Sequence, residues 1–165
     1  MSKTNIFWKD AYTRNHPALV KKIVPEEGII LEKTLFYPTS GGQPCDRGLI
    51  QFNDQVTSIL EARKTESGDV LLVPEVFPNQ LTVGMNGVQE INWELRYKHM
   101  QMHTALHLLS VVIPLPVTGG QIGPTKSRLD FSMPDPIENK QKVEDEINNL
   151  IQQDLKVEQL WITEA

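Results

Sequence analysis

A change of hydrophobic pattern at residue 93 limits the possible folds more than any other feature. The stretch Trp93–Val112 contains no glycine or proline, and its apolar residues recur at separations of three, four and seven. That spacing is typical of one face of a helix, and Pro114 and Pro116 would end it. We therefore predict a helix over residues 93–112 and a subdomain boundary near residue 90.

The residues before this helix form short β-rich runs separated by turns. The predicted strands cover 28–37, 48–52, 55–62 and 70–73, with Asn53-Asp54 as a hairpin turn. Segment 10–17 could be one helical turn or a loop. Several short strands at this spacing predict a small barrel or sandwich.

The residues after the helix predict a region that contains both strands and helices. A glycine-rich loop (119–124) leads into a strand over 127–132, and a helix begins at Asp135 with Pro136 as its first residue. A last strand covers 155–162. The fold class is therefore α+β, with a β-barrel subdomain over 1–90 and helices packed on antiparallel strands over 91–165.

Charge and cysteine content narrow the function classes. A net charge of −5 over 165 residues argues against a protein that coats nucleic acid nonspecifically. Local basic clusters could still contact one RNA end, or they could be solvated surface charges: Lys21-Lys22, Arg96-Tyr97-Lys98 and Lys126-Ser127-Arg128. With one cysteine, Cys45, and no secretory signal or apolar span, we expect a cytoplasmic location and no membrane partner.

Two histidines within the predicted helix could bind a metal. His103 and His107 are four residues apart, so both imidazoles lie on one helical face and can reach one Zn²⁺ ion. The spacing alone leaves open two unrelated histidines, one against the core and one exposed. No Glu lies between them, which argues against a His-Glu-x-x-His protease. His99 is ~12 Å from His107 along the axis, so we expect it at the surface or supporting a ligand.

Two glycine-rich segments supply candidate ligand-binding residues. Adjacent glycines let the backbone approach a ligand, although a plain turn is the alternative. In the first segment the candidates are Thr39, Ser40, Gly41, Gly42 and Gln43. After the second segment, Arg128 could contact a ligand or pair with Asp130, since both lie on one face of a strand.

Taken together, these motifs resemble one family. Segment 35–48 closely resembles the F-Y-P-x-x-G-G-Q-x-x-D-x-G signature of alanyl-tRNA synthetase editing domains and their stand-alone relatives, the alanyl-tRNA editing proteins. Segment 92–110 resembles the zinc helix of that family, with Asn92 where Asp is frequent, and Arg128–Phe131 resembles the strand after its second glycine loop. The likeness covers nearly the whole chain, in the right order.

The resemblance implies a fold and an activity. The fold would be a small N-terminal β-barrel followed by the two-layer domain shared by alanyl- and threonyl-tRNA synthetase editing modules. The activity would be hydrolysis of serine or glycine esters of mischarged alanine tRNA. The resemblance makes His103 and His107 ligands of Zn²⁺ and places Gly41-Gly42-Gln43 beside the amino-acid pocket. Thr39 or Ser40 would then sense a substrate hydroxyl.

One part of the family's zinc site has no counterpart in the sequence. The family completes the site with a Cys-x-x-x-His pair downstream of the region equivalent to 161–165, and this sequence ends there. A truncation would explain this, as would replacement of the ligands by Cys45, an Asp or a partner chain. A third explanation is a degenerate domain that binds a tRNA acceptor end or a protein without hydrolysis. A metal hydrolase acting on a small ester or amide is a weaker alternative.

Overall fold

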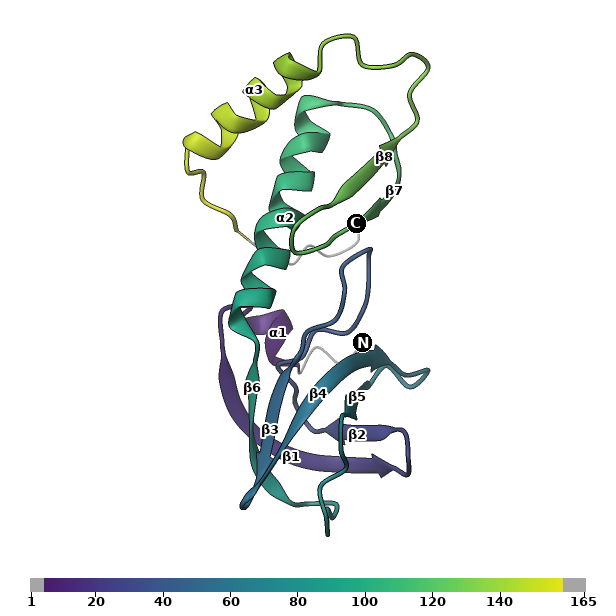
Figure 1. The fold of residues 1–165 in the computed structure, drawn as a ribbon, viewed down its shortest axis with the longest axis vertical. Helices are drawn as coiled ribbons and strands as arrows, with labels where there is room; N and C mark the ends of the chain where they lie inside the picture. The colour runs from purple at the N-terminus through teal and green to yellow at the C-terminus, as the bar shows by residue number, and fades with distance from the viewer. Residues whose placement is uncertain (1–4, 159–165) are drawn as a thin grey trace, which may run out of the picture.

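A closed barrel of six antiparallel strands forms the first half of the computed structural model, which describes residues 5–158 (Figure 1). The strand order around the barrel is β1-β2-β5-β4-β3-β6. The strands are β1 (Asn15–Val24), β2 (Gly28–Leu31), β3 (Gly48–Phe52), β4 (Gln55–Lys64), β5 (Val70–Pro74) and β6 (Asn86–Ile91), and the short helix α1 (Ile6–Lys9) precedes them. Closure leaves no long open sheet edge.

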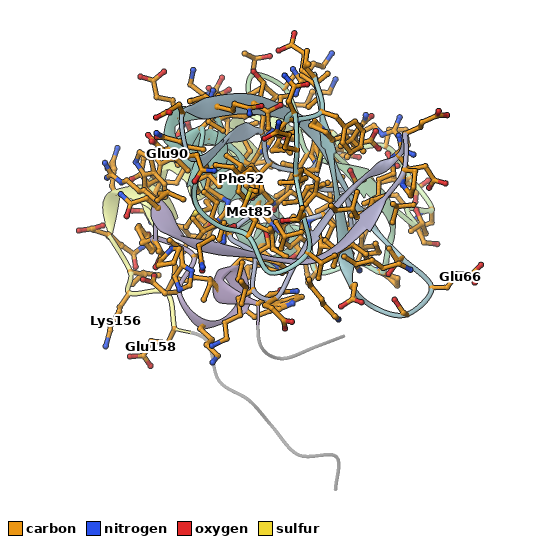
Figure 2. The ribbon with its side chains drawn as sticks, turned by 90° about the horizontal axis from the view of Figure 1, so that it is seen from below. Phe52, Glu66, Met85, Glu90, Lys156 and Glu158 are labelled. Atoms are coloured by element: carbon orange, nitrogen blue, oxygen red, sulfur yellow. The ribbon has the colours of Figure 1, made fainter. Side chains whose placement is uncertain are left out.

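The barrel holds most of the hydrophobic core. Alternate side chains of β3 point inward, so that Ile50 and Phe52 are almost completely buried. On β4, Ile59 and Ala62 are buried on either side of a register shift. Figure 2 looks at the barrel from below and shows Phe52 and Met85 within the ring of strands. Side chains therefore fill the interior of the barrel, which is not a pore.

A buried glutamine joins the barrel to the segment that follows β2. Gln89 Oε1 accepts hydrogen bonds from Leu35 N at 2.8 Å and Thr34 Oγ1 at 3.2 Å. Its Nε2 donates to the carbonyls of Pro17 at 3.0 Å and Lys33 at 2.9 Å. All the hydrogen-bonding groups of the amide are occupied in this way, which offsets the cost of its burial.

The predicted strand over 28–37 is correct only in its first part, because β2 ends at Leu31. Beyond it, successive backbone N–H groups bond to side chains instead of to a neighbouring strand. Thr34 N donates to Asn5 Oδ1, Leu35 N to Gln89 Oε1, and Tyr37 N to Asp46 Oδ2. These side chains, most of them distant in the sequence, therefore take the place of a neighbouring strand as hydrogen-bond partners.

The second half consists of α2 (Trp93–Val112), the hairpin β7 (Val117–Gln121) and β8 (Arg128–Phe131), and α3 (Lys140–Gln152). In Figure 1, α2 extends from the barrel with the β7–β8 hairpin on one side and α3 on the other. The barrel and the adjoining helices and sheet confirm the predicted α+β class. No helix within residues 5–158 is both long and apolar enough to cross a membrane.

Several predicted boundaries are wrong. The last helix begins at Lys140 and not near Asp135, because the side chain of Asn139 caps it by accepting from Lys142 N at 3.0 Å. The second glycine segment is partly strand, since β7 includes Gly119 and Gly120. Residues 155–158 form no strand, and the rest of the predicted strand, 159–162, lies outside the described residues.

Candidate functional site

A buried ion pair fixes α2 against the glycine-containing segment. Arg96 Nε donates to Asp46 Oδ1 at 2.8 Å, and Arg96 Nη2 also contacts Asp46 Oδ2. The remaining donors reach Leu35 O at 2.7 Å and Ala11 O at 2.9 Å, while Asp46 Oδ2 accepts from Tyr37 N at 2.6 Å. Both side chains are at most 3% exposed. This pair sets the distance between α2 and residues 37–46.

The first glycine pair forms a two-residue hairpin turn. Ser40 and Gln43 exchange backbone hydrogen bonds of 3.0 Å in both directions. Between them, Gly41 and Gly42 have φ angles of +58° and +77°. Positive φ at both central positions defines a type I′ turn, which glycine adopts without steric cost. The turn presents its tip toward the second half of the protein.

The two glycine-rich segments touch each other. Ile122 N donates to Gly42 O at 2.8 Å. A Cβ atom at Gly42 would lie 2.7 Å from the carbonyl oxygen of Gly120, whereas one at Gly41 would meet nothing within 4 Å. The absence of a side chain at Gly42 is therefore what lets β7 approach the turn.

Replacing Gly42 with alanine should separate these segments. The left-handed backbone alone costs an alanine about 1–2 kcal/mol, and Gly41→Ala shares that cost without the clash. We therefore expect Gly42→Ala to lose more unfolding free energy than Gly41→Ala in urea denaturation. Equal losses in the two variants would show that the contact with Gly120 contributes nothing.

The glycine turn also holds His103 of α2. His103 Nδ1 lies 2.8 Å from Gln43 Oε1. An amide oxygen only accepts, so Nδ1 carries the proton of this bond, and in the neutral ring Nε2 keeps its lone pair. The His107 ring stacks on His103 with a centroid separation of 5.0 Å and an angle of 13°. Both rings therefore lie on one face of α2, and the contact with Gln43 orients the His103 ring.

Burial keeps His103 neutral. Desolvation lowers the pKa of His103 below its ordinary value, and the nearby charge of His107 lowers this pKa further. A neutral imidazole with a free Nε2 can accept a proton or bind a metal ion. His103 is therefore in the protonation state that either role needs at pH 7.

A pocket of about 420 Å³ lies between α2, the glycine turn and the β7–β8 hairpin. Its lining combines two imidazoles and a hydroxyl with apolar side chains and glycine backbone: Gly41, Gly42, His103, Leu106, His107, Ser110, Val117, Gly119, Gly120, Ile122 and Leu129. Its volume and mixed lining are those of a small-ligand site.

The predicted binding residues occupy different places around this pocket. Gly41 and Gly42 line it, and Gln43 holds His103 from behind. Thr39 N bonds to Ala62 O at 3.2 Å, and Ser40 Oγ accepts from Lys64 Nζ at 2.6 Å. Their roles with a substrate stay predictions.

Arg128 lies on the exposed β7–β8 hairpin, where its Nε pairs with Asp130 Oδ1 at 3.0 Å. The neighbouring Leu129 lines the pocket instead. Sequence reasoning missed Leu106 and Ser110, although they lie three and seven residues after His103, which places them on its helical face.

The residues present fit half of a zinc site. The tautomer of His103 and the shared helical face suit a metal bound through two imidazoles. Within residues 5–158, however, no three His, Cys, Asp or Glu side chains are grouped closely enough to hold an ion. Cys45 packs against the barrel core and does not join the histidines.

Of the two positions expected for His99, the one at the surface is wrong, and support of a metal ligand stays a prediction. His99 is only 2% exposed, and its Nδ1 has no hydrogen-bond partner among the described residues. Burial lowers the pKa of His99; the charge of Asp46 raises this pKa and that of Arg96 lowers it. The net effect is a folded-state pKa below the ordinary value of about 6.5.

This depressed pKa predicts a loss of stability in mild acid. Unfolded His99, with its ordinary pKa, takes up a proton more readily than folded His99, so the unfolding free energy falls as pH drops below about 6.5. His99→Gln cannot titrate and should have a smaller slope of unfolding free energy between pH 7.5 and 5.5, measured by urea denaturation. Identical slopes for the two proteins would rule out this role of His99.

Known proteins resemble this chain in sequence. The family described as tRNA synthetases class II (A) matches residues 10–95. The alanyl-tRNA editing protein AlaX-M of Methanosarcina barkeri is 37% identical over 136 residues, 78% of this chain and 56% of that protein. AlaX-M of Pyrococcus horikoshii is 34% identical over 152 residues, 88% of this chain and 66% of that protein.

Longer enzymes match as well. The alanine–tRNA ligase of Pyrobaculum calidifontis is 32% identical over 161 residues, 92% of this chain and 18% of the ligase. Against the Methanosarcina relative, the match spans little more than half, 56%, of the relative's length. The chain therefore belongs to the tRNA synthetases class II (A) family, and its predicted resemblance to alanyl-tRNA editing proteins is confirmed.

Proposed function

We propose that this protein hydrolyses the ester that links serine or glycine to mischarged alanine tRNA. The observation that carries the proposal is the pocket lined by His103 of α2, whose ring Gln43 of the glycine turn orients. The relatives named alanyl-tRNA editing proteins support it. On this proposal the aminoacyl end of the tRNA enters between the glycine turn and the β7–β8 hairpin.

Polar groups of the pocket would position the aminoacyl group. Ser110 Oγ donates to the carbonyl of His107 at 2.7 Å, so its oxygen keeps lone pairs that can accept from a substrate hydroxyl or ammonium. Leu106, Ile122 and Leu129 supply apolar wall around it. These side chains would exclude bulk water and hold the ester near His103.

His103 and His107 would hold Zn²⁺, and Gln43 would keep Nε2 of His103 free for this bond. When bound, the ion would polarise the ester carbonyl or the attacking water. The described residues would contribute these two ligands, and Gln43 would restrict the rotation of one of them. His103, already neutral through burial, would need to lose no proton on binding the ion.

A deacylation assay tests the proposal. Alanine tRNA charged with serine, glycine or alanine is incubated with the protein and zinc. We expect the seryl or glycyl ester to be lost much faster than in buffer, while the alanyl ester persists. Decay of the seryl and glycyl esters at the buffer rate, even with excess protein, would contradict the proposal.

A further inference from the structure

A lysine without an ion-pair partner lies beside the glycine turn. Lys64 is the last residue of β4, and its side chain is exposed. Its Nζ donates to Ser40 Oγ at 2.6 Å, which holds the ammonium next to residues 40–43. Among the ion pairs within residues 5–158, none involves Lys64. Its charge is therefore held in place but not neutralised.

The acidic residues that lie near Lys64 in the sequence form no ion pair with it. Asp69 binds Lys21 Nζ at 2.7 Å, and Glu61 binds Arg63 at 2.8 Å. Glu66, two residues after Lys64, extends outward from the barrel in Figure 2. Within residues 5–158, Lys64 is therefore a cation without a paired carboxylate, in a protein whose net charge is −5.

The glycine turn adds unused hydrogen-bond donors at the same place. In the part of the chain that the structure describes, the N–H groups of Gly41 and Gly42 donate to no acceptor. Both residues line the pocket, and the space beside Gly41 is open. Successive free backbone N–H groups beside a cation form a recurrent anion-binding arrangement.

We propose that Lys64 and the amides of Gly41 and Gly42 bind a phosphate of the RNA strand whose 3′ end enters the pocket. The proposal rests on the proposed function, because that function brings an RNA strand to the glycine turn at the edge of the pocket. Lysine binds phosphate as a point charge, and the bond from Lys64 to Ser40 orients its ammonium before the RNA arrives. The phosphate would align the strand, and the pocket would hold the ester.

Binding of uncharged alanine tRNA at several salt concentrations tests the site. Fluorescence anisotropy compares the unmodified protein with Lys64→Gln, and with Lys22→Gln as control, since Lys22 is an exposed lysine of β1. Loss of one phosphate contact should weaken binding about fivefold to tenfold and reduce the slope of log Kd against log salt by about 0.7–0.9. Lys64→Arg should restore both, and Lys22→Gln should change neither.

The outcomes separate this site from the proposed function. If Lys64→Gln binds tRNA with an unchanged Kd and slope while the protein deacylates mischarged tRNA, the phosphate site is wrong and the function stands. An equal loss in Lys22→Gln would also overturn the site, because it would show a general charge effect. If the unmodified protein neither binds nor deacylates the tRNA, both proposals fail.

Discussion

Replacing Asp46 with alanine should lower the unfolding free energy by about 3–5 kcal/mol, since it leaves the buried guanidinium of Arg96 without its counter-charge. The substitution also removes the acceptor of Tyr37 N. Urea denaturation followed by circular dichroism measures the loss. The large size follows from burial, because an unpaired charge away from water has no solvent to compensate it.

An exposed ion pair provides the control for Asp46→Ala. Glu61 pairs with Arg63 at the surface, so Glu61→Ala should change the unfolding free energy very little. A loss below about 1 kcal/mol for Asp46→Ala would mean that the Asp46–Arg96 pair does not hold α2 to the barrel.

His103→Asn should lower kcat/KM for deacylation of seryl-charged alanine tRNA by at least about 100-fold. The substitution removes the imidazole that faces the pocket. Gln43→Ala leaves that imidazole in place but frees its orientation, so a smaller loss of about 10- to 100-fold is expected.

A half-buried histidine of the barrel serves as the control for His103→Asn and Gln43→Ala. His16 is on β1, where its Nδ1 lies 2.8 Å from the carbonyl of Pro17. His16→Asn should therefore keep the full rate. If His103→Asn and Gln43→Ala both fold normally and both keep the full rate, the reaction takes place elsewhere in the molecule.

The periodicity of the hydrophobic residues predicted both ends of α2. The helical pattern is uninterrupted, and the prolines that follow it, Pro114 and Pro116, are clear stop signals. Strands β1 and β6 were not predicted individually. The inward positions of β6 include Gln89, a polar residue that breaks the expected alternation and is accommodated by its own hydrogen bonds. A pattern of side-chain types cannot anticipate such a network.

The site was only partly predictable for a related reason. The spacing of His103 and His107 indicated a shared face, and the family resemblance indicated the glycine turn. Neither could show that Asp46 and Arg96 are buried, since charged side chains are rarely buried unless paired, and their pairing spans 50 positions in the chain. The hydrogen bond from His103 to Gln43 likewise depends on contacts that only the fold creates.

The most direct test of the account follows the histidine rings while a substrate analogue binds. Adenosine carrying serine through a stable 3′-amide is titrated into ¹⁵N-histidine-labelled protein, and the imidazole signals are recorded by NMR. We predict that the signals of His103 and His107 shift with saturation and that the signal of His16, away on β1, does not. Saturating analogue that leaves His103 and His107 unmoved would contradict the assignment of this pocket as the editing site.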